Sequence, residues 1–397
     1  MGAPNKTDTT ALILGGGCAG LHLGAALGQH GIDAQIIEPR TAYRNDRTWS
    51  FWQPVGAVDP AVTVGRWQSW SVQGIGQDQS VIRRSDELAY VSLGADRVYD
   101  RLLGRIADAP SIELHQGTKA EATPVWQDEA RHWVVSTSRG DITARYVFDS
   151  RPPAVTPGTY GQYFLGVEVR TERPAFDPTT AQIMHFRPVQ EGARGTDAID
   201  FLYVLPFADN HALVEVTRFT AVPPDPAALR RWLEAELAQQ LDGTIHEIAR
   251  EETGFIPMVV ARPKQPMPGA PGYCPIGIAG GAARASTGYA FTRIVEATQA
   301  LADQVRAGQP QPGLDPDGTV TRWMDQVFLS VLQRYPERAP ALFTQLFAAA
   351  PKDRVERFLS GSRALSDRFA VMRSLPTGPF LREALGLAGK SKAEGTT

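Results

Sequence analysis

The chain has 397 residues, more than one ordinary hydrophobic core would use, so we expect two interleaved domains with room to bury a large ligand. Its formal net charge of −3 at pH 7, with no block of Lys or Arg, argues against nucleic acid as a partner. The two cysteines, Cys18 and Cys274, provide neither a metal-ligand spacing nor a disulfide framework, so we expect no metal site and a cytoplasmic location.

A nucleotide-binding loop is the first predicted feature. An apolar run leads into a G-x-G-x-x-G motif formed by Gly15, Gly17 and Gly20. In a Rossmann unit these glycines form the turn, admit a pyrophosphate and let helix and strand pack closely, while the helix N-terminus faces the anion. A helix and a strand over 33–38 follow, and the strand ends on Glu38, an acid that can accept from ribose hydroxyl groups. The pattern predicts an ADP-containing cofactor in preference to an ordinary glycine-rich turn.

The rest of the first half mostly continues this nucleotide fold. Residues 43–70 are rich in aromatic and turn residues, do not follow the βα rhythm, and are predicted to form a loop or insertion. A helix, a short strand and a hairpin are then expected at 96–107, 112–116 and 133–149.

The middle of the chain predicts an antiparallel sheet. Clusters of Pro, Gly and Asp separate four β-rich runs, at 163–170, 182–186, 201–206 and 212–219. A helix over 226–240 is expected next, with Asp225 as its N-cap.

The chain then returns to the cofactor domain. After a Pro-rich link over 262–272, residues 276–281 are expected to be strand and turn, and 289–307 a helix. From Gly318 onward the chain is predicted to be mostly helical.

This order of elements is the layout of the glutathione-reductase-like FAD-binding α/β fold, with an inserted antiparallel β substrate domain and a helical C-terminal region. The predicted division is a first part of the FAD-binding domain (1–155), the β-rich substrate domain (156–262), the return segment (263–310), a C-terminal helical region with a possible membrane rim (311–389) and a disordered tail (390–397).

Further segments are more specific than the glycine loop. They are RTWSF at 47–51, FDSR at 148–151, FLYVLPF at 201–207 with ALVEVT at 212–217, GFIPM at 254–258 and AGGAARASTGYAF at 279–291. Together they resemble the bacterial lycopene β-cyclases, in the same order from about Ala11 to Leu385. The resemblance implies an isomerase of carotenoid biosynthesis that closes β-ionone rings on lycopene or a related linear carotene without net oxidation. It also implies reduced FAD, with NAD(P)H as an external reductant because only one G-x-G-x-x-G occurs in the sequence.

Ring closure gives an independent reason to look for one carboxylate in the β-rich domain, because a proton must be delivered to an alkene and another removed. Glu215 stands on the strand face opposite Val214 and Val216, and an apolar pocket there would raise its pKa. Matching cyclases carry an acid at this position to which catalysis is attributed. Glu215 is therefore the predicted acid/base, and the alternative is a solvent-facing strand residue.

Three positions depart from the better-known pattern of the family. Val216 stands where many members have a second acid, and His185 where they have an acid after the Met that aligns with Met184. His185 could replace it in proton transfer or could lie on an exposed strand face. Arg284 could meet the flavin pyrophosphate or a backbone carbonyl.

Cofactor contacts are expected from the loops and from the return segment, whose glycines could equally form a tight helix-packing turn. Asp149 could fix its loop and Arg151 approach a phosphate or the isoalloxazine, or the two could form only an internal pair. The predicted cofactor-binding residues are Gly15, Gly17, Gly20, Glu38, Asp149, Arg151, Gly280, Gly281, Thr287 and Gly288.

Aromatic side chains are expected to line a substrate tunnel, where their π faces could stabilise a carbocation, although most aromatic residues simply fill cores. Trp49, Phe51 and Tyr289 lie in the motifs themselves and are the predicted substrate-binding residues; further candidates are Trp52, Tyr203, Phe207 and Phe291.

A C40 hydrocarbon has almost no aqueous concentration, so the resemblance implies a peripheral protein that takes its substrate from a membrane surface. The polar segment Met1–Thr10 has no apolar core of a signal peptide, and no run approaches the roughly 18 apolar residues of a spanning helix. Two other functions remain open: a flavin-dependent isoprenoid monooxygenase or desaturase, and a non-enzymatic prenyl-binding protein.

Overall fold

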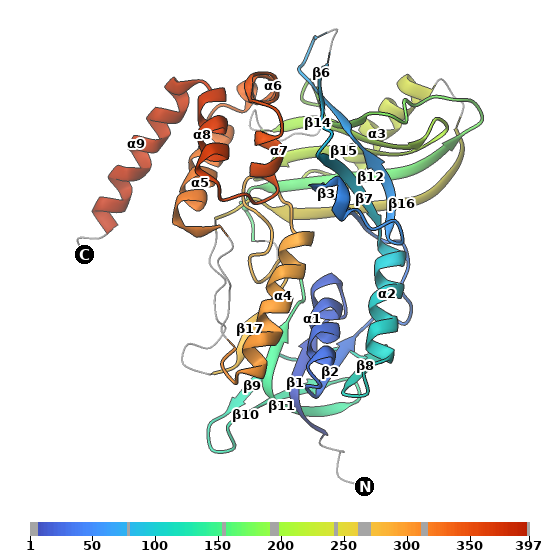
Figure 1. Ribbon diagram of the computed structural model, residues 1–397, viewed down its shortest axis with the longest axis vertical. Helices are drawn as coiled ribbons and strands as arrows, with labels where there is room; N and C mark the ends of the chain where they lie inside the picture. The colour runs from blue at the N-terminus through green and yellow to red at the C-terminus, as the bar shows by residue number, and fades with distance from the viewer. Residues whose placement is uncertain are drawn as a thin grey trace.

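The computed structural model describes residues 7–77, 80–152, 156–190, 198–241, 245–260, 271–310 and 317–394. Two sheets lie one above the other, and a group of C-terminal helices lies beside the upper sheet (Figure 1). Residues 262–270 of the Pro-rich link expected over 262–272 lie outside the described residues.

The lower sheet is the nucleotide-type sheet, in the order β8-β2-β1-β11-β10-β9, with β17 paired to β11. The pairings among β8, β2, β1, β11 and β17 are parallel, as a Rossmann unit requires. Because both faces are covered, β1 reads as an apolar run and Leu12, Ile13 and Leu14 have no exposed surface. The strands are β1 (Thr7–Leu14), β2 (Ala34–Glu38), β8 (Ile112–Gln116), β9 (Val125–Gln127), β10 (His132–Thr137), β11 (Gly140–Asp149) and β17 (Tyr273–Pro275).

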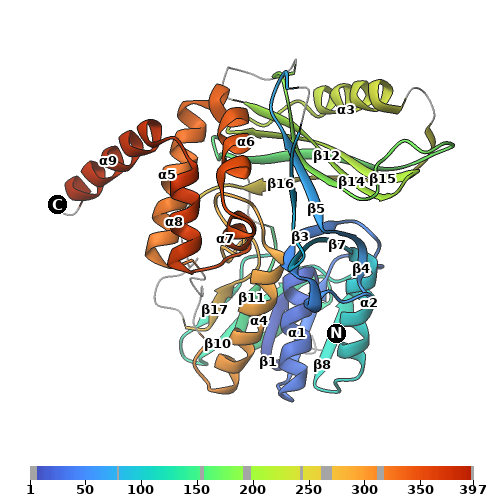
Figure 2. The same ribbon diagram turned by 45° about the horizontal axis from the view of Figure 1, so that its top comes forward.

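Helices α1 (Cys18–Gln29), α2 (Ala95–Ala107) and α4 (Phe291–Arg306) lie side by side against one face of this sheet (Figures 1 and 2). These helices, together with β1 and β2 on either side of the glycine loop and α1, confirm the predicted elements. The return segment differs from expectation, because its strand is β17 and residues 276–281 form a turn. Gly277 and Gly281 have φ of +64° and +81°, a backbone region that a strand does not use.

The upper sheet has the order β16-β12-β15-β14-β13-β5-β6 and contains the four predicted β-rich runs. Its strands are β5 (Ser69–Gln73), β6 (Val81–Arg84), β12 (Gly161–Thr171), β13 (Ala181–Arg187), β14 (Ile199–Ala208), β15 (His211–Thr220) and β16 (Ile245–Pro257). Helix α3 (Pro226–Leu241) covers its outer face (Figure 2), where Trp232 packs with Val214 and Val216. The expected N-cap is confirmed, since Asp225 Oδ1 accepts from the Ala227 N–H at 3.0 Å.

The aromatic region after residue 43 is strand-rich, so of the two expected alternatives, a loop or an insertion, the loop is wrong there. The strands β3 (Thr48–Pro54), β7 (Leu88–Gly94) and β4 (Thr63–Trp67) form a small antiparallel sheet, and η1 (Val55–Ala57) follows β3. Thr, Trp and Phe favour extended backbone, and here that preference outweighs the turn residues. Strands β5 and β6 join the upper sheet, although the expected division places them with the nucleotide domain, because Trp70 and Val72 are buried by this pairing.

The C-terminal region is helical, as predicted. It contains α5 (Gly318–Arg334), η2 (Pro336–Arg338), α6 (Ala339–Ala349), α7 (Arg354–Leu359), α8 (Leu365–Ser374) and α9 (Thr377–Glu394). The Phe343 ring packs on Phe186 of the upper sheet, with ring centroids 5.6 Å apart. Helix α9 runs through residues 390–394 of the tail for which disorder is expected, and 395–397 lie outside the described residues. The disorder of the tail stays a prediction. Among the described residues, no helix combines the length and apolar character needed to span a bilayer.

Candidate active site

One continuous cavity of about 1340 Å³ connects the nucleotide-type sheet with the inner face of the upper sheet and the C-terminal helices. Gly15 and Glu38 line one end, Glu215 lines the wall of the upper sheet, and Trp323 and Leu381 line the part among the C-terminal helices. This volume exceeds the roughly 300–1,000 Å³ of most small-molecule pockets. The cavity can therefore hold a nucleotide cofactor and a second, apolar molecule.

The glycine loop lines the cavity as the motif predicts. Gly15 has φ of +93° and Gly17 is the N-cap of α1, with no side chain to satisfy the first N–H groups of the helix. Gly20 lies outside the cavity, and a Cβ there would overlap the carbonyl oxygen of Gly15. Glu38 ends β2 and accepts the Gly16 N–H at 2.7 Å. The uncapped helix N-terminus facing the cavity suits an anionic group such as a pyrophosphate.

Asp149 and Arg151 form the internal pair that was one of their two expected roles. Arg151 Nη2 donates to Asp149 Oδ2 at 2.6 Å, and the Tyr273 hydroxyl donates to the same oxygen at 2.6 Å. Asp149 therefore holds its loop, while Arg151 also lines the cavity.

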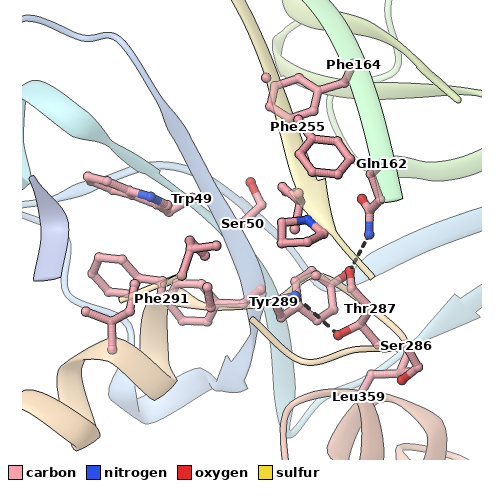
Figure 3. Close-up of a pocket in the computed structure, with 18 of the residues that line it drawn as sticks. Trp49, Ser50, Gln162, Phe164, Phe255, Ser286, Thr287, Tyr289, Phe291 and Leu359 are labelled. Atoms are coloured by element: carbon pink, nitrogen blue, oxygen red, sulfur yellow. Dashed lines mark hydrogen bonds between the residues drawn. The ribbon is translucent and has the colours of Figure 1, made fainter. Parts of the chain in front are cut away.

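The return segment contributes a part of the lining that differs from the expected one. Gly280 and Gly281 shape the turn and lie outside the cavity, whereas Thr287 and Gly288 line it. Gln162 of the upper sheet donates to the carbonyl oxygen of Thr287 at 2.9 Å (Figure 3), which ties the two parts of the cavity wall together.

Aromatic rings line the middle of the cavity and include the three predicted substrate-binding residues. Trp49 of β3 contacts Phe291, with ring centroids 5.3 Å apart (Figure 3). Phe51 of β3 stacks on the same ring at 5.4 Å. Tyr289 makes an edge contact with Trp52 at 5.7 Å. Trp52, Tyr203 and Phe291 also line the cavity, whereas Phe207 lies outside it and packs on Trp67.

Glu215 points into the cavity from β15, because Val214 and Val216 on either side of it are buried against α3. The Thr217 hydroxyl donates to Glu215 Oε1 at 2.7 Å. Burial, followed by the nearby Glu252 carboxylate, raises the pKa of Glu215 to about 8. This shift favours the protonated form of Glu215 in a largely apolar space, and the protonated form is the one a general acid needs.

A second acid, Glu252 of β16, also lines the cavity and was not predicted from the sequence. Its Oε2 accepts from Arg250 Nη1 at 2.7 Å and from the Thr48 hydroxyl at 2.8 Å. In the sequence, the signal that could have identified Glu252 is its position two residues before the GFIPM segment.

The three residues that depart from the family pattern, Val216, His185 and Arg284, lie outside the cavity. His185 is buried, not exposed, and bonds Ser71 Oγ through Nε2 at 2.8 Å. Burial, aided by Arg187, lowers the pKa of His185 to about 4. Arg284 pairs with Asp325 and donates to the Phe358 carbonyl oxygen, so it meets a backbone carbonyl.

The cavity reaches the surface among α5, α8 and α9. Trp323, Met372 and Leu381, one from each helix, line it and are 43%, 49% and 54% exposed. We call these three residues the mouth. Val320, Phe369 and Leu385 extend the exposed apolar surface at helical spacings of three or four residues from them, and Leu365 lies one further turn away, four residues before Phe369.

The family model described as lycopene cyclase protein matches residues 11–385. A curated relative named lycopene beta-cyclase, from Pseudescherichia vulneris, is 30% identical over 55% of this chain, and the match spans only 57% of that relative's length. Another lycopene beta-cyclase, from Paracoccus sp. (strain N81106 / MBIC 01143), is 27% identical over 74% of this chain and 75% of the relative.

Solved structures share the fold at low sequence identity. A geranylgeranyl bacteriochlorophyll reductase-like protein from Thermoplasma acidophilum has a TM-score of 0.61 and 12% identity, over 97% of this chain and 100% of that one. A flavin-dependent brominase has a TM-score of 0.59 and 13% identity, over 92% of this chain and 98% of that one. A probable FAD-dependent monooxygenase from Pseudomonas aeruginosa has a TM-score of 0.52 and 15% identity, over 93% of this chain and 99% of that one. The predicted fold class is therefore confirmed: the chain has the α/β fold of FAD-dependent oxidoreductases.

Proposed function

The chain belongs to the lycopene cyclase family, and from that premise we propose that it converts the ψ ends of lycopene into β-ionone rings, giving γ-carotene and β-carotene. The reaction is a proton-initiated cyclisation with no net oxidation. The observation that carries the proposal is the Glu215 carboxyl, with a pKa raised by burial, on the wall of a continuous, mainly apolar cavity.

Glu215 supplies the proton. Protonation of the terminal trisubstituted alkene forms a tertiary cation, the neighbouring alkene attacks it to close the ring, and loss of the C6 proton leaves the β ring. One proton is added and one is lost, so the product keeps the mass of lycopene. A carboxyl group in an apolar pocket is suited to both transfers because its two protonation states are close in free energy near neutral pH.

The aromatic rings exclude water from the cation and offer it their π faces. Tyr203 and Tyr289 line the cavity with Glu215, and burial raises the pKa of each well above its ordinary value. Both therefore stay neutral, and their rings can stabilise positive charge without forming a competing base.

The residues of the glycine loop fit FAD. Gly15, Gly17 and the uncapped start of α1 would receive the pyrophosphate, Glu38 the ribose, and Thr287 and Gly288 the flavin end. Bound in its reduced state, the flavin would supply negative charge near the cation without net redox change. NAD(P)H would act as the external reductant.

The mouth supports uptake of the substrate from a membrane surface. It carries three exposed apolar side chains at the rim of a cavity that suits a hydrocarbon, and the exposed Arg373 and Arg382 follow two of them directly in sequence. Apolar side chains flanked by basic residues favour the interface of a bilayer with anionic lipids. On this basis the protein works at the cytoplasmic surface of a membrane as a peripheral protein.

Expression in cells that accumulate lycopene tests the proposal, with the pigments separated by chromatography and weighed by mass spectrometry. γ-Carotene or β-carotene of unchanged mass is the expected result. A product that has gained oxygen or lost hydrogen would instead identify a monooxygenase or desaturase. If the lycopene is unchanged and the purified protein contains no flavin, the results would favour a prenyl-binding protein.

A further inference from the structure

Glu215 and Glu252 both flank Gly166. Gly166 of β12 is the direct register partner of Glu215 on β15 and of Glu252 on β16. Residues directly opposite one another project from the same face of a sheet, so both carboxyl groups lie on the cavity side of β12. The residue between them has no side chain, so nothing on β12 separates the two acids.

The glycine has a spatial reason to be there. Its φ lies outside the left-handed region, so the backbone does not require glycine, and a glycine inside a central strand weakens it. A Cβ at this position would lie 3.1 Å from the Cβ and 3.3 Å from the Cγ of Glu215, tighter than ordinary contact. Gly166 therefore keeps open the space that the Glu215 side chain uses.

The two acids have opposite surroundings. Glu252 is 7% exposed and holds an ion pair with Arg250 at 2.7 Å, and the Thr48 hydroxyl donates to the same carboxylate oxygen. Arg250 is itself anchored, since its Nε donates to Glu168 at 2.6 Å. Within the described residues, Glu215 has no ion pair. Glu252 thus has a cationic partner and a hydroxyl donor on its carboxylate, and Glu215 lacks the cationic partner.

We propose that Glu252 is a positioning residue for the proposed cyclisation: its negative charge, held in place by Arg250 and Thr48, keeps the carboxyl group of Glu215 in the acid form that donates the proton. Two carboxylates that share a poorly solvated site do not both ionise readily. The other groups that act on Glu215 are the Thr217 hydroxyl, which donates to it, and Arg250, and both oppose the effect of Glu252. The hydroxyls of Tyr90 and Tyr203 nearby are neutral. The inference rests on the proposed function, since it concerns the acid that the cyclisation needs.

The Glu252→Gln variant tests this role through the pH dependence of cyclisation in lycopene-loaded liposomes. The acid form of Glu215 is lost as pH rises, so the wild-type rate should fall on the alkaline side. Glu252→Gln removes the charge and keeps the shape, and should move this fall by about one unit toward lower pH, a typical size for such effects. Glu252→Asp keeps the charge and should restore a profile close to that of the wild type.

Glu251→Gln is the matched control. Glu251 is the adjacent glutamate on β16, is exposed, and pairs with Arg230 at the surface. Its substitution should leave the profile unchanged. If Glu252→Gln lowers the rate but leaves the pH profile unmoved, Glu252 has only a structural role and the proposal is overturned.

A second measurement needs neither turnover nor a folded Glu252→Gln variant. The infrared difference between wild-type protein and Glu215→Gln isolates the C=O stretch of a protonated Glu215. The band should be present at pH 7, and its absence would overturn the inference. A wild-type protein that shows the band but does not cyclise lycopene would refute the proposed function instead, so the two failures are distinguishable.

Discussion

Tyr203 and Glu215 are direct cross-strand partners on β14 and β15, and both line the cavity. The Tyr203 hydroxyl is hydrogen-bonded to the Tyr90 hydroxyl at 2.8 Å. This bond fixes the ring of Tyr203 beside the proposed acid. A cation that forms after proton transfer from Glu215 would therefore arise next to an oriented aromatic face.

Replacing the ring should cost more than removing the hydroxyl. We expect Tyr203→Leu to lower kcat of cyclisation about tenfold, since a desolvated cation–π contact contributes up to ~2 kcal/mol, and Tyr203→Phe to stay within about twofold. Phe207→Leu is the control, because Phe207 lies outside the cavity and should tolerate the change. Equal losses in Tyr203→Leu and Tyr203→Phe would assign the effect to the hydroxyl group of Tyr203 and not to its ring.

Glu215→Gln should abolish cyclisation while the protein retains its flavin, with a loss of at least about a hundredfold for a missing general acid. Pigment analysis and the flavin absorption spectrum measure the two properties separately. Near-normal turnover would remove Glu215 from the mechanism.

The same variant has a predicted effect on stability. Because the pKa of Glu215 is raised to about 8 in the folded protein, the unfolded chain releases this proton at lower pH than the folded chain does. The stability that this group contributes is fully present below its ordinary pKa and is lost as pH rises toward 8. Melting temperatures at pH 5 and pH 9 should show Glu215→Gln gaining a few degrees on the wild type at the higher pH. A difference that does not change with pH would contradict the raised pKa.

The glycine loop should separate folding from cofactor binding. A Cβ at Gly17 meets no atom within 4 Å, so Gly17→Ala should keep its fold but weaken flavin binding by placing a methyl group in the cavity, whereas Gly20→Ala should lose both. Gly104→Ala, at an exposed position within α2, is the control and should gain about 0.5–1 kcal/mol with unchanged flavin binding. Flavin titration and thermal melts give the two readouts. Unaltered flavin affinity in Gly17→Ala would argue that the loop does not hold the cofactor.

Local patterns predicted the elements whose causes are local. The Rossmann loop, the four β-rich runs and the placement of Glu215 all follow from residues close together in the chain. Glu252 was missed because its role depends on β12, whose Gly166 lies between β15 and β16, two strands that come well after β12 in the sequence. Strands β5 and β6 were misassigned for the same reason, since β5 pairs with β13 across about a hundred residues of chain.

His185 shows a second limit of pattern reading. Simple alternation would place Ile183 and His185 on one face of β13, with Met184 on the other. The register of β13 is irregular between Gln182 and His185, and Ile183 and Met184 both line the cavity while His185 does not. A β-bulge changes the face to which later side chains point, and sequence periodicity does not reveal it.

His185 should accordingly be dispensable for proton transfer. His185→Gln should keep the cyclisation rate within about twofold, with an unchanged pH profile, because the ring lies outside the cavity. Its pKa is lowered to about 4, so the wild type should lose stability as pH falls from 6.5 toward 4, and the variant should lose less. Rates and melts over this range test both statements. A displaced pH profile in the variant would restore His185 to the proton path.

The mouth should control access to the hydrocarbon without affecting the cofactor. Met372→Glu and Leu381→Glu place charges among exposed apolar side chains at the cavity rim, so both should weaken flotation with anionic liposomes and slow cyclisation of liposome-held lycopene. Val125→Glu is the control: Val125 is 51% exposed on β9 of the nucleotide-type sheet and lies outside the cavity lining. Flavin content should stay at the wild-type level in all three variants, because the glycine loop is untouched. If the mouth variants float and turn over as the wild type does, the substrate enters elsewhere; if they lose turnover but still float, the mouth admits substrate without being the membrane contact.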